Sequence, residues 1–141
     1  MFNPTREQVR GFFFDTWKKY RENAPLAGLE RIAIDVILAH PEYRQALEEP
    51  ERQAGREYSP ESGEGNPFLH MSLHLAVEEQ LSIDQPPGIK AEFERIARSL
   101  GDRHEALHCV LECLGETLWR AQRDAAAPDA EAYLECLKQQ R

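Results

Sequence analysis

The sequence predicts an all-α protein, a single domain formed by an irregular bundle of about five to seven helices. Apolar residues recur every three to four positions in each long segment, and no segment alternates with the period of a half-buried strand. Capping residues, prolines and glycines separate these segments. Because a chain of 141 residues matches the usual size of one domain, we expect residues 1–141 to share one core.

The first half of the chain is expected to contain two longer helices and a short one. The first spans about 4–22 and has a proline at an early position, where a helix tolerates it. The second spans about 29–40 and ends where Pro41 removes a backbone donor. A short helix fits 42–47. Residues 49–65 are rich in Gly, Pro and charge, and we expect a long surface loop that is either a plain connector or a lid.

Four helices are expected in the second half. The first of them begins after Asn66-Pro67, is apolar nearly all round, and should therefore be buried at the centre of the bundle. Gly101 should end the next one, and Asp102 with Glu105 forms a capping box that starts another. The expected ranges are about 67–82, 87–100, 102–124 and 129–139.

Charge and apolar content exclude two classes of partner. The formal net charge is −8, whereas proteins that bind nucleic acid carry clustered Lys and Arg to neutralise phosphates. The apolar run Phe12-Phe13-Phe14 is far shorter than the roughly 20 residues that cross a bilayer. We therefore expect neither nucleic acid nor membrane as a partner, and either another protein or a second copy of the chain as the alternatives.

The start of the chain and its cysteines favour the cytosol. Residues 1–4 lack the basic and then apolar pattern of a signal peptide. Cys109, Cys113 and Cys136 are odd in number, and the first two are spaced i, i+4 on one expected helix. This arrangement fits free thiols in a reducing compartment, where they serve as small buried hydrophobic residues or, less commonly, as redox or metal-binding groups.

Four of the five histidines form two pairs with a spacing of four residues. His70 pairs with His74, and His104 pairs with His108. On a helix this spacing places both imidazoles of a pair on the same face. The first pair shares its face with apolar residues, so its ring nitrogens need partners.

A carboxylate follows each pair one turn later, so both expected helices carry the same ladder of ligands. Helical bundles that bind iron, manganese or zinc direct His and Glu side chains inward from neighbouring helices, because imidazole and carboxylate suit these ions. We therefore expect a divalent metal, either zinc, iron or manganese. The candidate ligands are His70, His74, His104, His108, Glu78 and Glu112, with Asp35 and His40 as further candidates.

Two other interpretations of the histidines stay open. The rings could be core groups hydrogen-bonded to carboxylates or carbonyls, in which case the protein would be a non-enzymatic adaptor that acts through its surface. Residues 104–108 also match H-E-x-x-H, in which two histidines bind zinc and the glutamate is the general base of a hydrolase. This motif is short, and Glu105 is also expected to cap the helix.

Several strings resemble a known family. Residues 66–70 (NPFLH), 79–88 and 112–119 (ECLGETLW) are similar to small proteobacterial proteins grouped as a domain of unknown function, number 1841. Residues 1–4 and 35–43 resemble the same family, so the likeness covers nearly the whole chain. It implies a bacterial cytosolic protein and no particular activity. The architecture is loosely similar to hemerythrin-like and DinB-like metal-binding bundles, but their ligand spacings do not match, so no ligand is taken from them.

The leading hypothesis is a metal-binding helical bundle with a redox or hydrolytic role, since an open coordination position on the ion allows chemistry. The alternative is the adaptor with structural histidines. Distances between ring nitrogens discriminate between the two, because the ligands of one ion must converge to within about 5 Å of one another.

Overall fold

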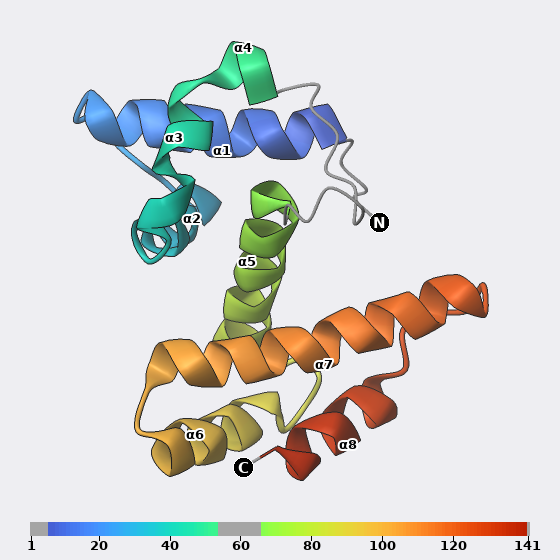
Figure 1. Cartoon of the computed structure of the whole chain (residues 1–141). Helices are drawn as coiled ribbons and strands as arrows, with labels where there is room; N and C mark the ends of the chain where they lie inside the picture. The colour runs from blue at the N-terminus through green and yellow to red at the C-terminus, as the bar shows by residue number, and fades with distance from the viewer. Residues whose placement is uncertain (1–5, 54–65, 141) are drawn as a thin grey trace. The chain divides into compact units, whose positions relative to one another are not determined.

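A computed structural model describes residues 6–53 and 66–140, and within these ranges it contains eight α-helices, one 3-10 helix and no strand (Figure 1). The prediction of an all-α fold is confirmed. None of the described helices is both long enough and apolar enough to cross a membrane. The chain divides into two compact units, residues 1–75 and 76–141, and the division falls inside helix α5.

Helices of the first unit surround a core of aromatic and aliphatic side chains. The elements are α1 (Arg6–Arg21), α2 (Leu29–Leu38), the 3-10 helix Pro41–Tyr43, α3 (Arg44–Glu48), α4 (Pro50–Gln53) and the first half of α5 (Pro67–Ile83). Phe13 and Trp17 of α1, Ile37 of α2 and Met71 of α5 are buried in one cluster. Apolar periodicity therefore locates α1, α2 and α5 correctly, although the expected start of the first helix at Pro4 lies outside the described residues.

Part of the expected surface loop is helical. Residues Pro50–Gln53 form α4, a single turn that begins with proline, and only 54–65 of the expected loop lie outside the described ranges. Four residues are too few to show an apolar period, so the pattern could not reveal this turn. The expected helix over 42–47 is also divided, because the 3-10 turn Pro41–Tyr43 precedes α3.

Helix α5 begins as predicted and is less uniformly buried than predicted. The side chain of Asn66 accepts hydrogen bonds from the backbone N–H groups of Phe68 (3.0 Å) and Leu69 (3.1 Å), which caps the helix at Pro67. Met71 and Val77 are fully buried, whereas Leu69 keeps 58% of its surface exposed. Apolar residues thus lie nearly all round α5, but only some of them are buried in the core.

The second unit contains the rest of α5 and three helices that contact one another: α6 (Ile89–Leu100), α7 (Arg103–Arg123) and α8 (Ala130–Gln139). Asp102 caps α7 by accepting from the backbone N–H of His104 at 2.9 Å, and Gly101 ends α6 with a φ of 71°. These boundary signals are confirmed. Helix α6 starts two residues later than expected, because Asp84 accepts from the backbone N–H groups that open it.

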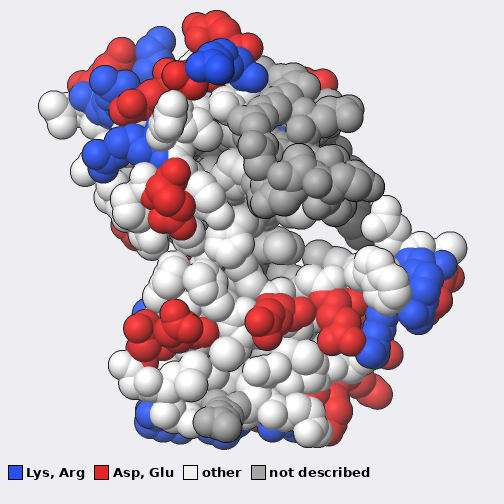
Figure 2. All heavy atoms as spheres, in the orientation of Figure 1, with Lys and Arg blue, Asp and Glu red and all other residues white. Residues whose placement is uncertain are grey.

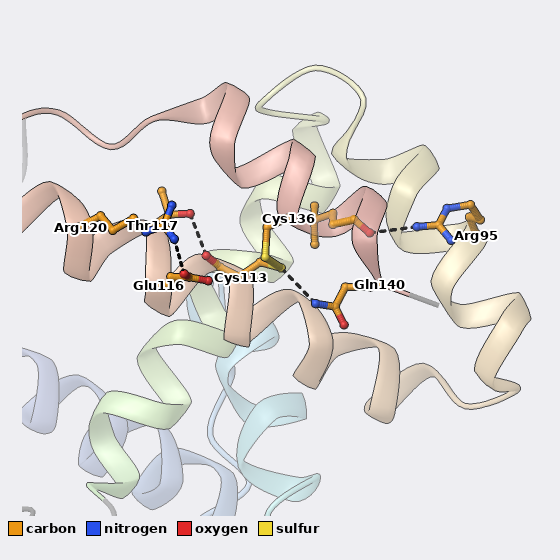
Figure 3. Close-up of a disulfide and its surroundings, with 8 residues drawn as sticks. Arg95, Cys113, Glu116, Thr117, Arg120, Cys136 and Gln140 are labelled. Carbon is orange, nitrogen blue, oxygen red and sulfur yellow. Dashed lines mark hydrogen bonds and ion pairs between the residues drawn. A yellow bond between two sulfur atoms is a disulfide. The ribbon is translucent and has the colours of Figure 1, made fainter.

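The expectation of three free thiols is wrong for two of the cysteines. Cys113 of α7 and Cys136 of α8 form a disulfide, with a Cα–Cα distance of 5.8 Å across a sequence separation of 23 (Figure 3). The sequence shows only the local spacing of Cys109 and Cys113 on one helix. The disulfide partner of Cys113 lies on α8 and comes close only when α8 packs on α7. Cys109 is free, and burial raises the pKa of its thiol.

Candidate metal centre

His40 lies directly between α2 and the 3-10 helix, with only 2% of its surface exposed. Its Nδ1 lies 2.8 Å from the backbone carbonyl of Val36, four residues earlier. A carbonyl only accepts, so Nδ1 carries the hydrogen and donates it. In the neutral ring, Nε2 is therefore left with a lone pair, and the local fold has selected the nitrogen that is able to bind a cation.

His70 and His74 lie one turn apart on α5, and the capped start of the helix determines where their face lies. Their ring centroids are 4.7 Å apart, and that of His40 lies 4.9 Å from His70 and 4.6 Å from His74. The Nε2 of His70 is 3.2 Å from the Nε2 of His40 and 3.1 Å from the Nε2 of His74. The first unit thus directs three nitrogens of the same kind toward one point.

The three Nε2 atoms are donors that suit a metal ion. The Nε2 of His40 offers a lone pair, because the hydrogen of its ring is on Nδ1. A cation at the point where the rings meet is able to accept a lone pair from each of the three nitrogens.

The spacing suits a small metal ion. Zinc–nitrogen bonds of about 2.0–2.1 Å in tetrahedral geometry place ligand nitrogens roughly 3.3 Å apart. The two direct contacts, at 3.2 and 3.1 Å, are close to this value, and the third pair of ligand atoms lies within 4.8 Å. Only 2% of the surface of His74 is exposed, so its side chain would shield a bound ion from water.

Tyr43 covers part of this histidine cluster, which we define as His40, His70 and His74. Its ring stacks on that of His40 with an interplanar angle of 5° and a centroid distance of 5.4 Å, and it meets His70 edge-on at 6.0 Å. Burial raises the pKa of the Tyr43 phenol, with a smaller contribution from Glu42. The 3-10 turn therefore supplies an apolar wall that holds the His40 ring in place.

Among the described residues, none of the carboxylates expected as ligands belongs to a group of three or more side chains that could hold a metal. Glu78, one turn after His74, accepts a hydrogen bond from Arg103 at 2.9 Å. Asp35 is exposed on α2, and Glu112 is exposed on α7. In Figure 2 acidic side chains follow α7 along the face in view, and the exposed glutamates of this helix are Glu105, Glu112 and Glu116. The three exposed glutamates of α7 form a solvated acidic face.

His104 and His108 form the second pair that the spacing predicted. Their ring centroids lie 4.3 Å apart on α7, in the second unit. Within the described part of that unit, no third His, Cys, Asp or Glu joins them to make a group of three ligand atoms. Because zinc hydrolases of the H-E-x-x-H type use three protein ligands, residues 104–108 do not by themselves make such a site in this unit.

The structure places His40 against His70, although the sequence offered it only as a further candidate. It has no histidine one turn away in the sequence, so the i, i+4 spacing does not point to it. The available signal was its position directly before Pro41, at the end of an expected helix. There the chain leaves the helix and a side chain is able to turn back toward the core.

Fold and site together define the class: an all-α protein with a partly buried histidine cluster between α2 and α5. The family model described as "Domain of unknown function (DUF1841)" matches residues 5–139, so the chain belongs to this family. The resemblance to domain of unknown function number 1841 is thereby confirmed. Neither a curated protein nor a solved structure matches the chain.

Proposed function

We propose that this protein binds a divalent transition metal through the Nε2 atoms of His40, His70 and His74. The observation that supports the proposal is the convergence of three like nitrogens, with contacts of 3.1–3.2 Å between neighbouring rings. Three imidazoles without a carboxylate favour zinc or ferrous iron over manganese, which prefers oxygen ligands.

Three protein ligands leave at least one coordination position for a substrate, as in catalytic zinc sites. A metal ion held by the three histidines would polarise the oxygen of a substrate bound at the open position or, if it is iron, exchange electrons with the substrate. The proposed role is therefore hydrolytic or redox. The chain's own residues hold the rings: the Val36 carbonyl orients His40, and Tyr43 stacks on it.

The test is the metal content of protein purified without an affinity tag or chelator. We expect about one zinc or iron per chain in the wild type, and a loss of most of it in His74→Ala. His104→Ala is the matched control, because it removes the same kind of ring from the other i, i+4 pair. Metal retained in that control assigns the site to the histidine cluster.

Other outcomes separate the alternatives. Equal loss of metal in His74→Ala and His104→Ala would favour the wider ligand set expected from the spacing, with both pairs. A wild type that holds no metal even after incubation with zinc or ferrous iron would overturn the proposal. Lost stability of His74→Ala in that case would indicate structural histidines and direct the search to protein partners.

We also propose a bacterial cytosolic location, which rests on the family resemblance alone. Disulfides in a reducing cytosol are uncommon, and those that form there are usually transient, catalytic or redox-sensing. Such a location therefore requires that the bond between Cys113 and Cys136 respond to thiols.

A further inference from the structure

A pocket of about 470 Å³ opens between α7, α8 and the turn that joins them. This volume lies within the range of roughly 300–1,000 Å³ that is typical of small-molecule sites. Thr117 and Arg120 of α7 and Ala132 of α8 contribute to its lining, and so does Cys136. One half of the disulfide, Cys136, therefore lies on the wall of this pocket.

The two sulfurs of this disulfide differ in access and in partners (Figure 3). Cys113 has no exposed surface, whereas Cys136 is partly exposed and lines the pocket. The side-chain amide of Gln140 donates a hydrogen bond to the Sγ of Cys113 at 3.6 Å. An approaching nucleophile thus meets Cys136, while a hydrogen-bond donor is already placed on Cys113.

We infer that the Cys113–Cys136 disulfide is a thiol-exchange site, at which a small-molecule thiolate attacks Cys136 from the pocket. A new sulfur–sulfur bond forms between the thiolate and Cys136, and the bond to Cys113 breaks. Cys113 leaves as a thiolate, next to the Gln140 amide, and takes a proton from water. A second thiolate then attacks the small-molecule sulfur, releases it as a disulfide and leaves Cys136 reduced. Two small thiols are oxidised and one protein disulfide is reduced.

Charge at the pocket selects the attacking thiol. Both arginines of the lining have acidic partners: Arg120 bonds Glu116 at 2.6 Å, and Arg123 bonds Asp124 at 2.9 Å. A third carboxylate, Asp129, is also in the lining. With its cations neutralised, the pocket offers no site for a strongly anionic molecule, so the fitting reactant is a small thiol with little net charge.

Helix α8 has anchors besides the disulfide, so exchange does not require unfolding. The hydroxyl of Tyr133 donates to the side chain of Gln80 at 2.7 Å, and Arg95 donates to the backbone carbonyl of Leu137 at 2.9 Å. Leu137 is fully buried. These contacts keep the two cysteines close after reduction, which allows the bond to form again.

The first test compares two variants in a Cys109→Ser background, which removes the remaining thiol. Cys113→Ser leaves only the Cys136 thiol, and Cys136→Ser leaves only the Cys113 thiol. Without denaturant we expect a neutral aromatic disulfide reagent to label the Cys136 thiol at least about tenfold faster than the Cys113 thiol. Equal or reversed rates would overturn the inference, provided that circular dichroism shows the same helix content in both variants.

The second test uses the wild-type chain and does not depend on the folding of variants. The protein is incubated with reduced 2-mercaptoethanol, a small neutral thiol, in native buffer, and free thiols are then trapped by alkylation. Peptide mass analysis should show the mixed disulfide on Cys136 and the alkyl group on Cys113. No adduct without denaturant, or an adduct on Cys113 in place of Cys136, would contradict the assignment.

Discussion

His40 depends on one local hydrogen bond for its orientation. Its Nδ1 donates to the Val36 carbonyl at 2.8 Å. One face of its ring stacks on the ring of Tyr43. Groups that orient a metal ligand commonly change metal affinity by about 10–100-fold when they are removed. The neighbours of His40 are therefore expected to matter although they are not ligands themselves.

Replacing Tyr43 tests this expectation. Tyr43→Ala removes the ring that stacks on His40 and should weaken metal binding by about tenfold, at the low end of such effects. Tyr43→Phe keeps the stack and should bind metal as the wild type does. Titration against a chromophoric chelator measures both affinities. Equal weakening in the two variants would mean that the hydroxyl, and not the ring, is responsible.

Tyr133 provides a prediction on pH. Its hydroxyl donates to Gln80 at 2.7 Å, and burial raises the pKa of the phenol above its ordinary value of 10.0. Above about pH 10 the unfolded chain releases this proton while the folded chain keeps it. The stability contribution of Tyr133 therefore falls as pH rises, by up to about 1.4 kcal/mol per pH unit.

The variant Tyr133→Phe lacks both the hydrogen bond to Gln80 and the phenol proton that titrates. At pH 7 it should be less stable by about 1 kcal/mol, because the hydrogen bond to Gln80 is lost. Near pH 11 the difference from the wild type should nearly vanish. Urea unfolding of the two proteins side by side at both pH values measures this, and a difference that does not change with pH would refute the assignment.

At the scale of elements, helix ends are determined by single capping side chains. Asp102 accepts from the backbone N–H of His104 at 2.9 Å and from that of Glu105 at 3.3 Å, and α7 begins there. Asp129 caps α8 in the same way through Ala132 at 3.1 Å. These bonds satisfy backbone donors that the first turn of a helix leaves without partners.

Substitution of Asp102 tests the cap of α7. Asp102→Ala should lower the free energy of unfolding by about 1 kcal/mol, whereas Asp102→Asn retains an accepting oxygen and should cost much less. Urea unfolding at neutral pH compares the two with the wild type. An alanine variant as stable as the asparagine variant would show that the cap contributes little to this helix.

The disulfide joins α7 to α8 and restricts the unfolded chain. For a separation of 23 residues, the chain-entropy model predicts about 3 kcal/mol of stabilisation. Cys136→Ser should lose this amount under non-reducing conditions, while Cys109→Ser, which breaks no bond, should change stability far less. Denaturant unfolding with and without a reductant provides the comparison, and a reductant should not affect Cys136→Ser.

At the scale of the whole molecule, each unit carries one chemical feature of its own. The histidine cluster lies in the first unit, and the disulfide with its pocket lies in the second. A ligand that binds only the folded chain raises its stability by mass action. Metal binding should therefore be visible in the unfolding of the protein as well as in its composition.

Thermal unfolding of metal-free protein tests this linkage. Zinc at about 100 times its dissociation constant should stabilise the wild type by about 2.7 kcal/mol and raise its melting temperature. His74→Ala should show no such shift, although its helix content before melting should match the wild type. A shift of the same size in both proteins would place the ion elsewhere.

The sequence by itself determined the features that depend on neighbours within a few residues. Apolar periodicity and capping located the helices 67–83 and 103–123, and the i, i+4 spacing of His70 and His74 placed their rings together. Such signals can be read without a fold, because a helix brings residues three and four apart into contact wherever it lies.

Only the tertiary structure decided the contacts between residues that are distant in the chain. His40 meets His70 across 30 positions, and Cys113 meets Cys136 across 23. No local period records such pairs, because they form only when separate helices pack and bury their apolar faces. Packing of this kind also pairs Glu78 with Arg103, 25 residues later. The spacing from His74 had predicted that Glu78 is a metal ligand, whereas the structure shows it in an ion pair.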